Sequence, residues 1–263
     1  MKHIILLFLI LLPSLILAQQ VNFEDDFSDG DFSTNPTWSG ADSNFTIASL
    51  DGNQVLRLNA NGTGSSYIST VSINAVGYWE FFVRLDFSPS NNNFTQIFLM
   101  SDIADLSGAV NGYALRAGEN LSGDVFRLFK ITNGEQDGEI LTGTTNISSG
   151  GSYRVKVTRD ASGNWNLEVV EGYNGSLAQE ATGTDNTYTT TSFFGLQATY
   201  TSSNAKSFYY DFKINQPPVV VEPLFVDSFT LINDTQIDIS FTKDIDPASI
   251  STSDFILNPS SVN

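Results

Sequence analysis

Residues 78–87, YWEFFVRLDF, constrain the fold of this chain more than any other segment, because apolar and polar side chains alternate along them. The first set consists of Trp79, Phe81, Val83, Leu85 and Phe87. The second set consists of Tyr78, Glu80, Phe82, Arg84 and Asp86. Side chains that alternate with a period of two lie on opposite faces of a β-strand. The segment therefore predicts a strand whose aromatic face anchors a hydrophobic core and whose other face meets solvent.

Two aromatic side chains, Tyr78 and Phe82, stand among the charged residues of the solvent face. Such rings either stack on a ligand or pack across strands within the sheet, and cross-strand packing is the commoner role. Both interpretations stay open at this stage. The candidate ligand-binding residues are Tyr78, Phe82, Arg84 and, from a later strand, Tyr209.

The N-terminus has the pattern of a secretory signal peptide. A short basic start is followed by the apolar run 4–17 and by Ala18, a small residue suited to cleavage. A membrane anchor is the alternative, but the run is shorter than the roughly 20 residues that a spanning helix needs, and no basic cluster follows it. We therefore predict a signal peptide over residues 1–18, no membrane insertion of the mature chain, and a secreted or cell-surface location.

The composition of the mature chain excludes several kinds of chemistry. His3 is the only histidine, it lies in the predicted signal peptide, and the sequence contains no cysteine. Catalytic triads that use histidine, cysteine nucleophiles, zinc sites built from these residues, and disulfides are all excluded. A secreted chain of this size without cysteine is typical of bacteria, and the chain lacks the cysteine of a lipid-anchored lipoprotein.

The charge is strongly acidic, with 29 Asp and Glu residues against 12 Lys and Arg and a formal net charge of -17. A field of this sign disfavours nucleic acid and anionic membranes as partners. It suits divalent cations better, but solubility outside the cell is the favoured explanation of this charge.

The rest of the first 214 residues predicts about a dozen short strands separated by turn signals, an all-β pattern typical of an antiparallel jelly-roll β-sandwich. The predicted strands besides 78–87 span residues 21–27, 45–50, 54–58, 67–73, 94–100, 113–116, 124–131, 153–159, 165–170, 193–200 and 208–214. Asp51-Gly52 and Asn133-Gly134 predict turns, and residues 134–138 a solvated loop. The predicted core consists of Trp79, Phe81, Val83, Leu85, Val155, Val157, Trp165, Leu167 and Val169.

A proline-rich linker and a second strand pattern follow this domain. We assign residues 19–214 to the sandwich and residues 215–223, NQPPVVVEP, to an extended linker. Strands are predicted over 224–232, 238–241 and 255–257. Since an immunoglobulin-like domain needs about 100 residues, we interpret residues 224–263 as an incomplete Ig-like domain, with partner domains expected downstream.

Four segments resemble the concanavalin A-like, laminin-G-like jelly-roll domain of secreted Bacteroidetes surface proteins. They are FEDDFSDGDFSTNPTWSG (23–40), GYWEFFVRLDF (77–87), YRVKVTRDASGNWNLEV (153–169) and FYYDFKI (208–214). Residues 225–257 resemble the start of an S-layer-type bacterial Ig-like domain, with FTKDIDPAS at 241–249 as the matching motif. The resemblance implies a non-catalytic extracellular module that binds a polysaccharide or another ligand, or a purely structural adhesin spacer.

The same fold hosts glycosidases with a Glu-x-Asp-x-x-Glu motif, which places two carboxylates on one strand face. This chain lacks that motif. Glu80 and Asp86 share a face but lie roughly 20 Å apart along a strand, while Glu168 and Glu171 fall on opposite faces. A glycoside hydrolase is therefore the least favoured of the three functions.

The resemblance also implies a structural calcium ion where the first and last strands of the domain pair. Calcium prefers carboxylate and carbonyl oxygens, and Asp26 and Asp211 are the first candidates to bind it, with Asp25 after them. Asp29 and Asp31 are lesser candidates. The alternative is that these are surface carboxylates of an acidic protein, because their spacing is not that of an EF-hand loop.

Overall fold

The computed structural model describes residues 7–9, 23–118, 123–215, 226–233, 236–241 and 257–259. The chain divides into two compact units, residues 20–217 and residues 1–19 with 218–263. All strand pairs in the larger unit are antiparallel, and its one helical segment in the described residues is a single 3₁₀ turn at Asp42–Asn44. The predicted all-β sandwich is confirmed.

The first sheet of the larger unit has seven strands in the order β11-β10-β9-β8-β15-β6-β3. Its strands are β3 (Ser39–Gly40), β6 (Gly64–Val71), β8 (Phe94–Ser101), β9 (Gly112–Ala117), β10 (Phe126–Thr132), β11 (Glu135–Thr142) and β15 (Phe193–Tyr200).

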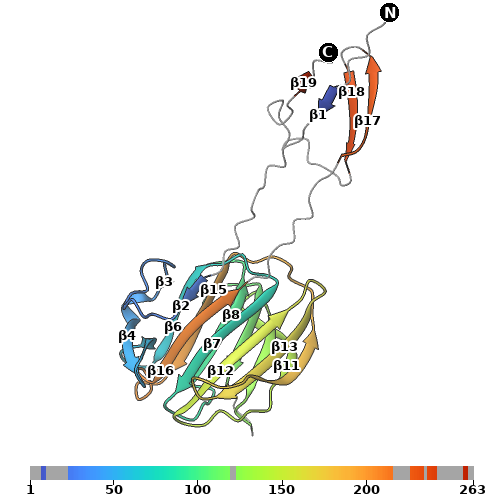
Figure 1. Ribbon diagram of the computed structural model, residues 1–263. Coiled ribbons are helices and arrows are strands. Elements are labelled where there is room, and N and C mark those ends of the chain that lie inside the picture. The colour runs from blue at the N-terminus through green and yellow to red at the C-terminus, as the bar shows by residue number, and fades with distance from the viewer. Residues whose placement is uncertain are drawn as a thin grey trace, which may run out of the picture. The chain divides into compact units, whose positions relative to one another are not determined.

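The second sheet has eight strands and contains β7, which includes most of the alternating segment 78–87. Its order is β14-β13-β12-β7-β16-β5-β4, and β2 pairs with the second half of β16 beside β5. Its strands are β2 (Phe23–Asp25), β4 (Phe45–Leu50), β5 (Asn53–Leu58), β7 (Gly77–Leu85), β12 (Gly151–Arg159), β13 (Asn164–Glu171), β14 (Ala178–Thr184) and β16 (Phe208–Asn215). β7, β12 and β13 lie side by side in Figure 1.

The hydrophobic core lies between the two sheets, and every residue of the predicted core is buried. The rings of Trp79 and Trp165 stack with centroids 5.8 Å apart. Phe212 on β16 lies at a second aromatic centre, 5.2 Å from both Trp38 and Phe194. Large rings brought together from strands distant in sequence therefore contribute a large apolar area to the contact between the sheets.

Two hairpin turns have the geometry that their sequences predict. Asp51 and Gly52 both have positive φ, 51° and 88°, between β4 and β5. Asn133 and Gly134 have φ of 53° and 84° between β10 and β11. Two successive residues with positive φ match the right-handed twist of the flanking strands.

The prediction of a loop is wrong for residues 135–138, which begin β11, although these residues are exposed as predicted. β14 was not predicted at all. Each of the two strands is the outermost strand of its sheet, and most of their residues are at least partly exposed. An edge strand with few buried residues lacks the clear alternation from which strands are predicted.

The smaller unit contains the hairpin of β17 (Val226–Asn233) and β18 (Gln236–Phe241) and the pair of β1 (Leu7–Leu9) with β19 (Leu257–Pro259). Most of the predicted signal peptide, the predicted cleavage at Ala18 and residues 216–223 of the predicted linker lie outside the described residues. The described residues contain no helix that is both long and apolar enough to cross a membrane.

Candidate functional site

A row of polar side chains crosses four strands on the outer face of the eight-stranded sheet. The strand register places Tyr78 of β7 opposite Thr158 of β12, Thr158 opposite Asn166 of β13, and Asn166 opposite Thr182 of β14. Their sequence neighbours Trp79, Val157, Trp165 and Leu167 face the core. Because side chains alternate along a strand, the four polar residues point outward together.

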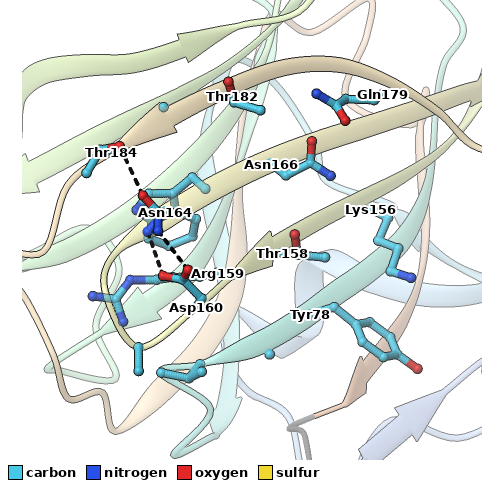
Figure 2. Close-up of a pocket in the computed structure, with 15 residues that line it drawn as sticks. Tyr78, Lys156, Thr158, Arg159, Asp160, Asn164, Asn166, Gln179, Thr182 and Thr184 are labelled. Carbon is cyan, nitrogen blue, oxygen red and sulfur yellow. Dashed lines mark hydrogen bonds between the residues drawn. The ribbon is translucent and has the colours of Figure 1, made fainter.

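An open groove of about 920 Å³ follows this row. Figure 2 shows the hydroxyl and amide side chains of Thr158, Asn166, Gln179 and Thr182 lining it from three neighbouring strands. Most of the polar groups in the groove are uncharged. Such groups both donate and accept hydrogen bonds, as the recognition of a polyhydroxylated ligand requires.

The β12–β13 turn closes one end of the groove and is held by Asp160. Its carboxylate accepts hydrogen bonds from the backbone N–H of Ser162 at 2.9 Å and from Asn164 Nδ2 at 2.7 Å. The Asn164 side chain keeps the pKa of Asp160 below its ordinary value. Gly163 has φ of 79°, and a Cβ there would lie 2.6 Å from the Asp185 carbonyl oxygen. The turn is therefore rigidly built.

Arg159, at the groove floor, is a structural residue. It is 3 % exposed, and its Nη atoms donate to the carbonyl of Ala75 at 2.6 Å and to Asn186 Oδ1 at 2.5 Å. Its guanidinium also lies 5.3 Å from the Trp165 ring centroid. These contacts use both of its Nη groups, while its buried Nε has no hydrogen-bond partner in the described residues, so Arg159 supports the groove from below.

Tyr78 and Lys156 form the opposite side of the groove from β14, and Lys156 Nζ lies 4.6 Å from the Tyr78 ring centroid. The register places Lys156 between Glu80 and Glu168, yet Lys156 makes no ion pair within the described residues. Asn166 Oδ1 is buried and has no hydrogen-bond partner in the described part of the chain. The groove thus offers an aromatic ring, an ammonium group and an unsatisfied amide oxygen.

A buried ion pair covers the centre of the same sheet face. Arg154 Nη1 donates to Asp211 Oδ1 at 2.6 Å, and Tyr173 in the β13–β14 loop donates its hydroxyl to Asp211 Oδ2. Burial acts to lower the pKa of Arg154, but the Asp211 carboxylate outweighs it and the pKa is raised. Burial and the same carboxylate raise the pKa of Tyr173 to about 12.

This arrangement corrects the prediction for Phe82, which is 1 % exposed although it lies on the outward face of β7. The ring of Tyr173 covers it at 4.9 Å between centroids, and the backbone N–H of Phe82 donates to Asp211 Oδ1 at 3.0 Å. Phe82 is thus packed beneath a loop and is not available to a ligand.

Arg84 and Tyr209 are direct cross-strand partners on the outer face and do not line the groove. Arg84 Nε donates to Asp86 at 2.7 Å, and the Arg57 guanidinium lies 5.5 Å from the Tyr209 ring centroid. Of the four predicted ligand-binding residues, the groove contains Tyr78 alone.

The structure does not bring the predicted calcium ligands together. Asp25 is opposite Phe212, which faces the core, so Asp25 and Asp211 point to opposite faces of the sheet. Asp26 is exposed and accepts the backbone N–H of Ser28 at 3.0 Å. The lesser candidates, Asp29 and Asp31, are also at the surface. In the described ranges, no three or more Asp, Glu, His or Cys side chains are grouped so that they could hold a metal ion.

Asp25 has a structural partner instead. Its Oδ2 accepts a hydrogen bond from the buried Trp38 Nε1 at 2.7 Å, and its Oδ1 accepts the backbone N–H of Phe27 at 3.0 Å. Burial raises the pKa of Asp25 to about 6 despite these bonds. The carboxyl group therefore ties the segment after β2 to the core.

Sequence reasoning missed Thr158, Asn166, Gln179 and Thr182. The alternation of residues 153–159 and 165–170 was visible and assigns Thr158 and Asn166 to the outer face. Their alignment with Tyr78 depends on strand register, and Gln179 and Thr182 lie on the unpredicted β14. The register between two strands that are distant in sequence cannot be predicted from the sequence of either strand alone.

No family model matches the sequence, and no curated protein matches it. The fold does resemble solved structures. The carbohydrate recognition domain of Emp46p in its metal-free form has a TM-score of 0.51 at 12% identity, with 73% of this chain and 94% of that chain covered. The VIP36 exoplasmic/lumenal domain bound to Ca²⁺ and Man3GlcNAc has a TM-score of 0.50 at 13% identity, with coverage of 76% and 90%.

The carbohydrate-binding module CBM66 from Bacillus subtilis has a TM-score of 0.43 at 16% identity and covers 68% of this chain and 93% of its own. At these identities the likeness concerns the fold. The larger unit accordingly shares the jelly-roll β-sandwich fold of the Emp46p and VIP36 domains.

Proposed function

We propose that the sandwich is a non-catalytic carbohydrate-binding module of a secreted or cell-surface protein, and that the groove on β7, β12, β13 and β14 binds the saccharide. The observation that carries this proposal is the outward row Tyr78, Thr158, Asn166 and Thr182, which places a ring, two hydroxyls and an amide in one groove.

The chemistry of the row suits a sugar. Each sugar hydroxyl donates and accepts hydrogen bonds, and threonine hydroxyls and asparagine amides supply both functions. The apolar face of a sugar ring packs on an aromatic side chain, the role we give to Tyr78. The buried Oδ1 of Asn166 gains most, because an unsatisfied buried acceptor costs about 1–3 kcal/mol. The names of the Emp46p and VIP36 structures, which mention carbohydrate recognition and a mannose-containing ligand, agree with this class.

We infer binding without hydrolysis from the placement of the carboxylates. Glycoside hydrolysis needs two carboxyl groups across the scissile bond, one of them protonated. Glu80 and Glu168 face the same side of the sheet, but the register places Lys156 between them. Asp160 is engaged by the turn that it holds.

The charge around the groove favours a neutral ligand. Lys156 is flanked by Glu80 and Glu168, and the chain as a whole carries a formal charge of -17. A saccharide rich in carboxylate or sulfate groups would approach against this field. We therefore propose neutral sugar polymers or oligomers as the ligand class.

Retention of the protein in native gels that contain laminarin, yeast mannan, levan or xylan tests this function. At least one polymer should retard the protein, and Tyr78→Ala and Asn166→Ala should each weaken retention about tenfold, equal to about 1.4 kcal/mol. Tyr209→Ala is the matched control, because it removes an aromatic ring from the same sheet face outside the groove. A protein that none of the polymers retards would favour the structural spacer, and release of reducing sugar would favour the glycosidase.

A further inference from the structure

A second row of polar side chains crosses the outer face of the other, seven-stranded sheet. The strand register aligns Arg127 of β10, Arg116 of β9, Gln96 of β8, Gln197 of β15 and Tyr67 of β6 as successive cross-strand partners. Their sequence neighbours Leu128, Leu115, Ile97, Leu196 and Ile68 face the core. All five polar side chains therefore point away from the core, and each is partly exposed.

The two glutamines at the centre of the row have unused hydrogen-bonding groups. Neither the Gln96 nor the Gln197 side-chain amide makes a hydrogen bond within the described ranges, whereas Asn44, Asn111, Asn164 and other amides of the sandwich do. The two are directly opposite each other on adjacent strands. Two neighbouring amides offer two donor groups and two acceptor groups to a ligand lying on the sheet.

The loop between β8 and β9 leaves this row open while it covers the next one. Leu106 and Val110 of the loop pack with Phe98, Ala114 and Phe129 in a second buried apolar cluster on this outer face. Tyr67 packs against the edge of that cluster. The covered residues Phe98, Ala114 and Phe129 therefore lie beside the polar row, and the loop above them borders it on one side.

Arg116 marks the other side of the open row. Its guanidinium stacks on the Phe94 ring at 3.8 Å, and its Nε donates to the Gly118 carbonyl at 2.9 Å. Both contacts fix the plane of the guanidinium on the sheet surface. A planar group held in place in this way loses little conformational entropy when a ligand binds.

We propose that this row is a second saccharide-binding surface, which takes an extended neutral polysaccharide chain lying across the strands. Strands lie about 4.8 Å apart, so the five positions span about 19 Å, a length that suits several sugar units in a line. The amide pair would bind hydroxyl groups at the centre, and Tyr67 would contact a ring face at one end. The acidic net charge of -17 disfavours a polyanion as the occupant.

The surface lies on the opposite side of the sandwich from the groove, so the two would bind independently and one molecule could bridge two polysaccharide chains. The test uses the protein with paired variants. Gln96→Ala with Gln197→Ala removes the amides of the row, and Tyr78→Ala with Asn166→Ala alters the groove. Gln54→Ala with Gln136→Ala removes two exposed amides elsewhere and serves as the matched control.

Affinity for laminarin, mannan, levan and xylan, and for alginate as an anionic comparison, is measured by gel retardation, with thermal melting to confirm folding. We expect the row variant to lose at least fivefold in affinity for a neutral polymer while the control variant keeps wild-type affinity. The groove variant should still bind a neutral polymer, with the affinity that the row alone provides.

Equal affinity of row variant and wild type overturns the second surface, and stronger wild-type binding to alginate than to every neutral polymer overturns its neutral occupant. Loss of all binding in the groove variant alone supports the proposed function and overturns the row. Loss of all binding in the row variant alone supports the second surface and overturns the proposed function of the groove. A wild-type protein that binds none of the five polymers contradicts both proposals.

Discussion

The buried ion pair of Arg154 and Asp211 gives the sharpest prediction at the scale of single residues. Replacing Asp211 with Asn leaves a buried guanidinium without its counter-charge, and such a change costs about 3–5 kcal/mol of unfolding free energy. Asp86→Asn breaks the Arg84 pair at the surface, which should cost about 1 kcal/mol or less. Urea denaturation measures both. Equal losses would show that the Tyr173 loop does not shield the pair.

The raised pKa of Asp25, about 6 against an ordinary 3.8, predicts a pH dependence. Between about pH 4 and pH 6, Asp25 is protonated in the folded state but ionised in the unfolded state. The protonated group therefore contributes stability that is fully present below about pH 4. This contribution is lost as the pH rises to about 6. The loss amounts to at most about 3 kcal/mol. The stability of wild type relative to Asp25→Asn should therefore fall over this range, and a constant difference would contradict the assigned environment.

The calcium expectation is tested by a thermal melt in millimolar Ca²⁺ and in excess chelator. Asp211 would have to release Arg154 and Tyr173 to bind a cation, and Asp25 would have to release Trp38. We expect the same melting temperature under both conditions. A higher temperature in Ca²⁺ that Asp211→Ala abolishes would restore the site inferred from the resemblance.

At the scale of elements, β7 joins the core to the outer face, and both of its central phenylalanines are buried. Phe81→Ala should cost about 3–5 kcal/mol because it leaves a cavity between the sheets. Phe82→Ala should also destabilise the protein, by about 2–4 kcal/mol, because it removes the surface on which Tyr173 packs. Denaturation midpoints measure both. A Phe82 variant as stable as wild type would show that the loop does not depend on this ring.

The same strand shows how far sequence reasoning reaches. Its alternation correctly placed Trp79, Phe81, Val83 and Leu85 in the core, because one face of a strand must be apolar wherever a second sheet covers it. It failed for Phe82, because a loop from β13 to β14 covers part of the outer face. When a distant loop covers part of a strand, the alternation of apolar and polar residues in that strand does not reveal it.

The functional surfaces depend even more on pairings that the sequence does not encode locally. Thr158 and Gln197 are ordinary polar residues in their own strands. They become parts of a groove and of a row only because β12 pairs with β7 and β15 pairs with β8. Residue type and face were therefore predictable, while the partners across the sheet were not.

At the scale of the whole molecule, the two sheets of the larger unit cover each other's inner faces, and each sheet has a polar surface on its outer face. The formal charge of -17 keeps such a molecule soluble and disfavours polyanions. The predicted signal peptide and the proposed secreted location agree with a ligand found outside the cell. The division into residues 20–217 and the smaller unit leaves each proposed surface within one unit.

The central claim, that the groove on β7, β12, β13 and β14 binds a neutral saccharide, is tested most directly by mapping amide chemical shifts of the ¹⁵N-labelled protein. The protein is titrated with the polymer of the neutral panel that retards it most, cut to short oligomers. We predict the largest shift changes at Tyr78, Thr158 and Asn166 and in the Asp160–Asn164 turn. Unchanged shifts at these residues, with or without changes elsewhere, would contradict the claim.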